Sequence, residues 1–229
     1  MRIATWNCYR GECRLRAARL QSLRPDIVVL QECGKPTTPV DDRCIWFGDR
    51  PSQGVGVIAH GEWSVEPGPV DPNVMDSVYP VRVKGPVEFH LLAVWAKPSP
   101  TYVRAVMHGL DRYREFIHEA PSLVVGDFNS HPRWDSSDSK ANHTVLAARL
   151  KNEFRLVSAY HAAAALSGSL HESATLYWRW QADQLFHIDY CFIPGSWSDR
   201  LGEVSVGSYS DWTDSDHRPL LVEVALEAI

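Results

Sequence analysis

Short apolar runs that end at a polar side chain are the feature that most constrains the fold of this chain. Residues 27–30 read IVVL and lead to Glu32. Residues 123–125 read LVV and lead to Asp127 and Asn129. Apolar runs of this length, bounded by turn-forming residues, are typical of strands buried in a sheet. The sequence therefore predicts a buried sheet whose strands carry carboxylates and amides at their ends.

Strand patterns and helix patterns alternate along the 229 residues. Strands are predicted at 2–7, 26–32, 54–60, 87–96, 122–127, 175–180, 186–193 and 218–226. Helices are predicted at 12–23, 102–119 and near 142–153, and the second has the clearest helical spacing of apolar residues. Proline and glycine are frequent between residues 51 and 86, which favours loops and short edge strands over a linker between domains.

The formal net charge of −5 weighs against tight, non-specific binding to nucleic acid, because phosphate neutralisation supplies most of that affinity. It does not exclude an enzyme whose acidic residues hold a metal ion that contacts a phosphate. Five cysteines without a CxxC pair are expected to be buried free thiols in a reducing compartment. No apolar segment is typical of a signal peptide or reaches the length of a membrane span. We therefore expect a cytoplasmic protein that does not bind a membrane.

Seven polar residues lie at or near the ends of predicted strands: Asn7, Glu32, Asp127, Asn129, Asp189, Asp216 and His217. Packed sheets bring strand ends together, so these groups can converge on one pocket. Clustered carboxylates are unfavourable without a cation, and oxygen ligands suit a hard divalent ion such as Mg²⁺. His217 would then transfer a proton or orient another group. Taken one at a time, these residues have ordinary interpretations, such as a solvated strand end for Glu32 or a turn at 126–129. Their occurrence together, each at or near the end of a predicted strand, favours a functional site.

The chain resembles the endonuclease/exonuclease/phosphatase superfamily, which includes exonuclease III and deoxyribonuclease I, in five motifs that occur in the same order: TWN at 5–7, LQE at 30–32, GDFN at 126–129, HIDY at 187–190 and SDHRPL at 215–220. These motifs extend over nearly the whole chain, so the resemblance implies one catalytic domain over residues 1–229. It implies a four-layer α/β/β/α sandwich with two mixed sheets packed face to face. It also implies hydrolysis of a phosphoester by in-line attack of water with Mg²⁺ or Mn²⁺.

The resemblance also implies a role for each motif residue. Glu32 matches the main metal ligand, with Asn7 and Asp216 close to the ion. Asp127 matches the carboxylate that orients or deprotonates the attacking water, and Asn129 matches the amide that holds a phosphate oxygen. The resemblance pairs Asp189 with His217, with the carboxylate orienting the imidazole. Whether His217 accepts the proton of the water or stabilises charge on the phosphate stays open.

One position departs from the pattern of many relatives. They place a histidine that touches the phosphate just after the strand that corresponds to 90–96, whereas this chain has Lys97 nearby. Lys97 would supply a point positive charge. Members similar to exonuclease III use a tyrosine further on, which Tyr102 matches. Tyr102 either contacts the phosphate or begins a helix and packs on the sheet.

The sequence constrains the identity of the substrate less than it constrains the type of reaction. Trp178 is a candidate to stack on a nucleobase. The alternative is that Trp178 and Trp180, which occupy alternate positions of a predicted strand, fill the core of the sheet. Arg10 is a candidate to contact a phosphate backbone, or it lies on a solvated basic face. We expect a monomeric DNA nuclease similar to exonuclease III. The alternatives are a phosphoesterase acting on a small nucleotide, sugar or lipid-headgroup phosphate and, less favoured, a non-catalytic binding module.

Overall fold

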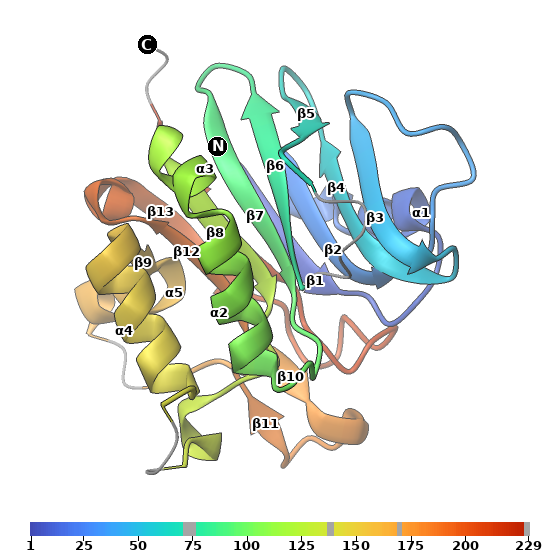
Figure 1. The fold of residues 1–229 in the computed structure, drawn as a ribbon. Coiled ribbons are helices and arrows are strands. Elements are labelled where there is room, and N and C mark those ends of the chain that lie inside the picture. The colour runs from blue at the N-terminus through green and yellow to red at the C-terminus, as the bar shows by residue number, and fades with distance from the viewer. Residues whose placement is uncertain (71–76, 137–139, 169–170, 227–229) are drawn as a thin grey trace.

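Two six-stranded sheets lie face to face in the computed structural model, which describes residues 1–70, 77–136, 140–168 and 171–226 (Figure 1). The first sheet has the order β13-β14-β1-β2-β4-β3 and contains β1 (Arg2–Asn7), β2 (Ile27–Cys33), β3 (Cys44–Arg50), β4 (Gln53–Ala59), β13 (Leu201–Val206) and β14 (Leu220–Val224). The second has the order β5-β6-β7-β8-β12-β9 and contains β5 (Ser64–Pro67), β6 (Val78–Lys84), β7 (Phe89–Trp95), β8 (Ser122–Asp127), β9 (Leu156–Ser158) and β12 (Asp189–Pro194). Both sheets are mixed, because β1 and β2 are parallel, as are β7 and β8, whereas the other pairs are antiparallel.

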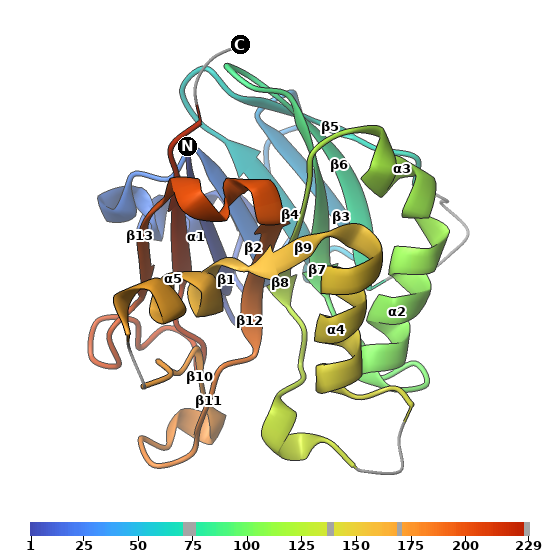
Figure 2. The ribbon, with the colours of Figure 1, turned by 90° about the vertical axis from the view of Figure 1, so that its left-hand side faces the viewer.

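Helices cover the outer faces of both sheets (Figures 1 and 2). The helices are α1 (Cys13–Arg19), α2 (Tyr102–Arg112), α3 (Arg114–Glu119), α4 (His143–Phe154) and α5 (Ala159–Ser167), with short 3₁₀ helices η1 (Gln21–Leu23), η2 (Pro132–Trp134), η3 (Trp178–Trp180) and η4 (Gly195–Arg200). Helix α1 packs on the first sheet, and α2, α3 and α4 pack on the second. Helix α5 contacts both β12 and β13, so it spans the two sheets at one side. The architecture is the expected four-layer sandwich.

Three apolar cores correspond to the interfaces between these layers. The largest lies between the sheets, one lies under α2, α3 and α4, and one lies under α1. All six residues of β8 are buried, since this strand has neighbours on both sides and layers on both faces. Gly126 in this strand has φ +144°, and a Cβ there would come within 1.9 Å of the Val94 carbonyl oxygen. Only glycine fits this position, directly before Asp127.

The small hairpin of β10 (Leu176–Tyr177) and β11 (Leu185–Phe186) lies below the two sheets in Figures 1 and 2. The sequence predicted a strand over 175–180, but only two of its residues pair as β10 and the rest form η3. The predicted helix 102–119 is divided into α2 and α3 at Tyr113. The predicted strand 186–193 is divided between β11 and β12, and the predicted helix 12–23 is divided into α1 and η1. The remaining predicted strands and helices are present, with shifted ends. None of the described helices is long and apolar enough to span a membrane.

The sheet register brings the functional strand ends to one edge. Asp189, the first residue of β12, lies directly opposite Asp127, the last residue of β8. In the facing sheet, Asn7 ends β1 opposite Gln31, one residue before Glu32. Contacts between β1 and β8 bring these two pairs of strands together. The fold therefore collects carboxylates from four separate strands or loops at a single place.

Candidate active site

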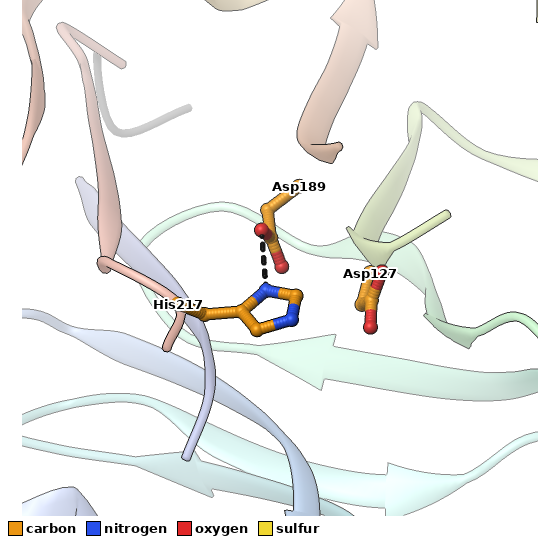
Figure 3. A group of neighbouring side chains, drawn as sticks. All are labelled: Asp127, Asp189 and His217. Atoms are coloured by element: carbon orange, nitrogen blue, oxygen red, sulfur yellow. Dashed lines mark hydrogen bonds and ion pairs between the residues drawn. The ribbon is translucent and has the colours of Figure 1, made fainter. Parts of the chain in front are cut away.

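Asp127, Asp189 and His217 form a compact buried group (Figure 3). One ligand atom of each lies within 4.8 Å of the others. Asp127 and Asp189 come from paired strands, and His217 comes from the loop that precedes β14. Two carboxylates and an imidazole this close can act on one small group, such as a water molecule or a phosphate.

Asp189 holds His217 through a hydrogen bond between Oδ2 and the imidazole Nδ1, 2.8 Å apart. The second ring nitrogen of His217 points towards Asp127 (Figure 3). Burial alone would lower the pKa of His217, but the negative charges of Asp189, Asp127 and Asp216 raise it to about 10. The imidazole is therefore a cation at neutral pH, with one N–H directed to Asp189 and one into the site.

Asp127 is fully buried and fixed by three hydrogen bonds. Its Oδ2 accepts from the amide nitrogen of Asn7 at 2.9 Å and from that of Asn129 at 3.0 Å. Its Oδ1 accepts from the backbone N–H of Asn129 at 2.8 Å. Burial raises the pKa of Asp127 to about 7, although the charge of His217 opposes this. A carboxyl group with such a pKa can both release and accept a proton near neutral pH.

Asn7 connects this group to Glu32. Its amide nitrogen, which bonds Asp127, also donates to Glu32 Oε1 at 3.2 Å. The other oxygen of Glu32 accepts from Gln53 at 2.8 Å. Glu32 and Asn129 both have positive φ, at 60° and 46°, which is strained for residues other than glycine. Such strain is kept where the surroundings fix a side chain for function.

The donor set fits a divalent cation. Burial raises the pKa of Asp216, and the charge of Glu32 raises it further against the opposing charge of His217. Asp189 Oδ1 is buried and has no hydrogen-bond partner among the described residues. Four carboxylates thus converge near a single imidazolium, and a divalent ion would relieve the excess negative charge. Glu32 and Asp216 are the two of these carboxylates that lie outside the compact group of Asp127, Asp189 and His217.

Arg218, which the sequence analysis did not single out, organises the loop that carries Asp216 and His217. Its guanidinium is buried and lies 4.8 Å from the ring centre of Tyr177 and 4.9 Å from that of Tyr209. It donates to the backbone carbonyls of Ser215 at 2.7 Å, His217 at 3.1 Å and Tyr209 at 2.9 Å. The Arg in the SDHRPL motif was the available signal, but a charged residue in a polar loop is ordinarily exposed.

The two candidates for the phosphate contact lie in different surroundings. Tyr102 is the first residue of α2, and its side chain is half-exposed. With Asn129 and Trp134 it lines a cavity of about 200 Å³. Lys97 has its ammonium 4.9 Å from the ring centre of Trp95 and 4.0 Å from the Asp49 carboxylate. Tyr102 is therefore the candidate that shares a cavity with a residue of the site, whereas Lys97 approaches an acidic residue outside it.

The candidates for substrate contact are exposed. Trp178 and Trp180 are both half-exposed, so the interpretation that they fill the core is wrong. The backbone N–H of Arg10 donates to the Glu32 carbonyl at 3.1 Å, which places Arg10 beside the site. Its side chain lies over the ring of Tyr9. The five cysteines are free and buried, as predicted.

His143 lies outside the compact group of Asp127, Asp189 and His217. The residue begins α4, and its Nδ1 lies 3.0 Å from the Ser130 hydroxyl. Burial lowers the pKa of His143 to about 4, against the opposing charge of Asp135. The unfolded chain binds this proton below pH ~6.5, so stability falls as pH drops from about 6.5 to about 4.

We expect His143→Gln to remove this dependence. Between pH 7 and 5, the wild-type protein should lose about 2 kcal/mol more free energy of unfolding than the variant. Urea unfolding at both pH values measures it, with His108→Gln on the exposed side of α2 as the control. Asp127 and His217, whose pKa values are raised, contribute to the pH dependence of stability with the opposite sign. Both residues are present in the wild-type protein and in the variant, so their contributions cancel in the comparison. Equal losses in the two proteins would refute the assignment.

Comparisons with known proteins agree with the fold. The model of the Endonuclease/Exonuclease/phosphatase family matches residues 4–217. The chain belongs to this family. It is accordingly an enzyme of the phosphoester hydrolase class.

Solved structures with the same fold cover the chain almost completely. A 3′ phosphatase from Neisseria, NExo, bound to a product DNA hairpin, has a TM-score of 0.70 at 20% identity, with 99% of this chain and 100% of that chain covered. The endonuclease domain of TRAS1, a telomere-specific non-LTR retrotransposon, has a TM-score of 0.70 at 16% identity, with 99% and 98% covered. An AP endonuclease from Archaeoglobus fulgidus has a TM-score of 0.63 at 16% identity, with 99% and 100% covered. No curated protein matches the sequence significantly.

Proposed function

We propose that this chain is a divalent-metal-dependent phosphodiesterase that cleaves DNA, acting as one domain over residues 1–229 and as a monomer. The observation that carries the proposal is the buried group of Asp127, Asp189 and His217 beside Glu32 and Asp216. Such a group supplies both proton transfer and charge stabilisation, which the hydrolysis of a phosphodiester requires. A cytoplasmic location remains a prediction from the sequence.

Glu32 and Asp216 would hold the cation, Mg²⁺ or Mn²⁺, with Asn7 fixing the orientation of Glu32. The bound cation would neutralise charge on the phosphate and lower the pKa of a bound water. The chain's own residues supply the remaining chemistry. Asp127 is held by Asn7 and Asn129, so its carboxylate has a fixed direction from which to orient the attacking water and accept its proton.

His217 would stabilise charge on the phosphate. Its Nδ1–H is committed to Asp189, so the second N–H is available to a non-bridging phosphate oxygen. Asn129 would donate to a phosphate oxygen on the other side, and Tyr102 or Lys97 would supply a further contact. Tyr102 begins α2, and the other three groups lie within three residues of a strand end, so each is held close to a rigid element of the fold.

DNA is favoured as the substrate by the exposed aromatic and basic residues next to the site, Trp178 and Arg10 among them. The Neisseria relative with the same fold is described in complex with a product DNA hairpin. The alternative is a phosphoesterase for a small nucleotide, sugar or lipid-headgroup phosphate, which the net charge of −5 favours. A binding module without activity is disfavoured, because every group needed for hydrolysis is present.

The test is hydrolysis of plasmid DNA, an oligonucleotide with an abasic site and a small phosphodiester, each with Mg²⁺, with Mn²⁺ and with EDTA. We expect activity on DNA that EDTA abolishes and that falls steeply with added salt, because phosphate contacts release counterions. A flat salt profile on DNA, with faster turnover of the small phosphodiester, would favour the alternative. Activity that persists in EDTA would contradict the metal requirement.

Glu32→Gln tests the metal assignment directly. The substitution keeps the shape and the acceptor for the Asn7 amide, while Gln53 can turn its own amide to accept from the new NH2 group. It removes the negative charge that a cation needs. We expect Mn²⁺ affinity to fall at least about tenfold, by analogy with the loss of groups that orient metal ligands. Calorimetric titration of the folded protein measures it, with the exposed Glu62→Gln as the matched control. Unchanged affinity in a folded Glu32→Gln protein would end the assignment.

A further inference from the structure

Four exposed aromatic side chains lie on neighbouring segments beside the site, and we name them the aromatic rim: Tyr9, Trp178, Trp180 and Tyr209. Their exposed fractions are 42%, 45%, 41% and 39%. Tyr9 and Trp180 meet edge to face, with ring centres 5.1 Å apart, and the Tyr209 hydroxyl donates to the Trp180 carbonyl at 2.8 Å. Three segments far apart in the sequence therefore contribute to one surface.

The aromatic rim borders the active site. The backbone N–H of Tyr9 donates to Asn7 Oδ1 at 3.2 Å. The residue before Trp178, Tyr177, donates its N–H to the carbonyl of Asp216 at 2.8 Å. A phosphate held by His217 and Asn129 would thus have the aromatic rim next to the site on its Asn7 and Asp216 side.

The backbone under the aromatic rim is strained. Tyr9 and Arg10 have φ of 47° and 73°, and Arg179 and Trp180 have φ of 54° and 59°. The left-handed conformation costs a residue other than glycine roughly 1–2 kcal/mol. Two facing segments each keep a pair of such residues, and their side chains meet at the Tyr9–Trp180 contact. Strain of this kind persists at ligand-binding positions that the surrounding structure fixes.

The aromatic rim also carries positive charge. The guanidinium of Arg10 lies 5.7 Å from the ring centre of Tyr9, and that of Arg179 lies 5.9 Å from the ring centre of Trp178. Within the described part of the chain, neither has a carboxylate partner. By contrast, Arg14, Arg16 and Arg19 on α1 pair with Asp41 or Asp214. The two arginines at the aromatic rim are therefore available to an anionic ligand.

We propose that the aromatic rim binds unpaired nucleobases of the strand being cut, so that the substrate has a single-stranded segment next to the scissile phosphate. This inference rests on the proposed function. Aromatic faces stack on any unpaired base, whereas the bases of a duplex are stacked on one another and closed to such contact. Arg10 and Arg179 would contact the phosphates between those bases. Aromatic rings, unpaired cations and an adjoining phosphodiesterase site together fit a nucleic-acid strand better than a protein.

The experiment compares hydrolysis of single-stranded oligothymidylate with that of an abasic oligomer of equal length, which has the same phosphates and no bases. The wild-type protein should prefer oligothymidylate by about 5- to 150-fold in kcat/KM for each base that stacks. Trp180→Leu and Trp178→Leu keep an apolar side chain and should each lower this ratio at least fivefold. Leu166→Ala, on the exposed side of α5, is the control and should leave the ratio unchanged. Thermal unfolding verifies that each variant folds.

Three results would overturn the inference. An equal or inverse preference in the wild-type protein needs no variant and refutes base stacking. A folded Trp180→Leu protein with an unchanged ratio would assign the aromatic rim to another partner, such as a protein. A wild-type preference for a double-stranded thymidylate–adenylate duplex over the single strand would also contradict it. If the proposed DNA nuclease function itself is wrong, the result is different: neither oligomer is cut, whereas a small phosphoester is hydrolysed.

Discussion

Removal of Asp189, of His217 or of both should lower kcat/KM by about 10²–10⁴-fold, and the double variant should be little worse than the worse single variant. The reason is their direct bond, since Asp189 Oδ2 lies 2.8 Å from His217 Nδ1. Without the carboxylate, the imidazole loses its fixed direction and the charge that keeps it protonated. Without the imidazole, Asp189 has no partner through which to act.

The measurement is a cycle of Asp189→Ala, His217→Ala and the double variant at saturating Mg²⁺, with folding verified by circular dichroism. Glu172 and His161 provide the matched control, because their side chains form a similar pair at 2.9 Å outside the active site. Glu172→Ala and His161→Ala should leave kcat/KM unchanged. If the two losses at Asp189 and His217 multiply, the residues act independently and the proposed unit is wrong.

Arg218→Lys should destabilise the protein by about 3 kcal/mol or more. Arginine makes three hydrogen bonds to backbone carbonyls there and lies against the rings of both Tyr177 and Tyr209. Lysine has a compact charge and cannot reproduce the planar fork. The loss of two hydrogen bonds from a charged, buried donor costs about 1.5–3 kcal/mol each.

Urea unfolding of Arg218→Lys measures the effect, with Arg104→Lys on the exposed side of α2 as the control. Since the same carbonyls belong to the loop that carries Asp216 and His217, kcat should fall together with stability. A variant as stable and active as the wild-type protein would show that the loop is held by its other contacts. These include the bond from the Ser215 hydroxyl to the Asn7 carbonyl at 2.7 Å.

The strands that carry the active site could be predicted from the sequence because the apolar run and the polar residue at its end are both local features. The run LVV followed by Asp127 combines an apolar core segment with a polar end, and the structure places that end where β12 begins. Helix α5 was missed, since its residues AYHAAAALS are mostly alanine and have no apolar periodicity. Its position depends on Ala159 packing into the core between the sheets, which is a long-range contact.

Two further differences have physical causes that no local pattern reveals. Tyr177 to Trp180 alternate in a way typical of a strand, but Arg179 and Trp180 adopt left-handed backbone conformations that end the pairing. The helical spacing of 102–119 continues through Tyr113, where the backbone leaves the helical region, and the chain begins a second helix. The burial of Arg218 depends on two tyrosines from separate segments, which sequence spacing cannot bring together.

The pairing of β8 with β12 makes hydrolysis a sensitive reporter of folding. Asp127 and Asp189 are opposite each other in an antiparallel ladder, so a slip of one residue would turn the side chain of Asp189 to the other face of the sheet. A chain that had collapsed with most of its secondary structure but the wrong register would look folded by circular dichroism and be inactive. In refolding experiments, the delay between the return of the circular dichroism signal and the return of activity would therefore measure how long these two strands take to find their partners.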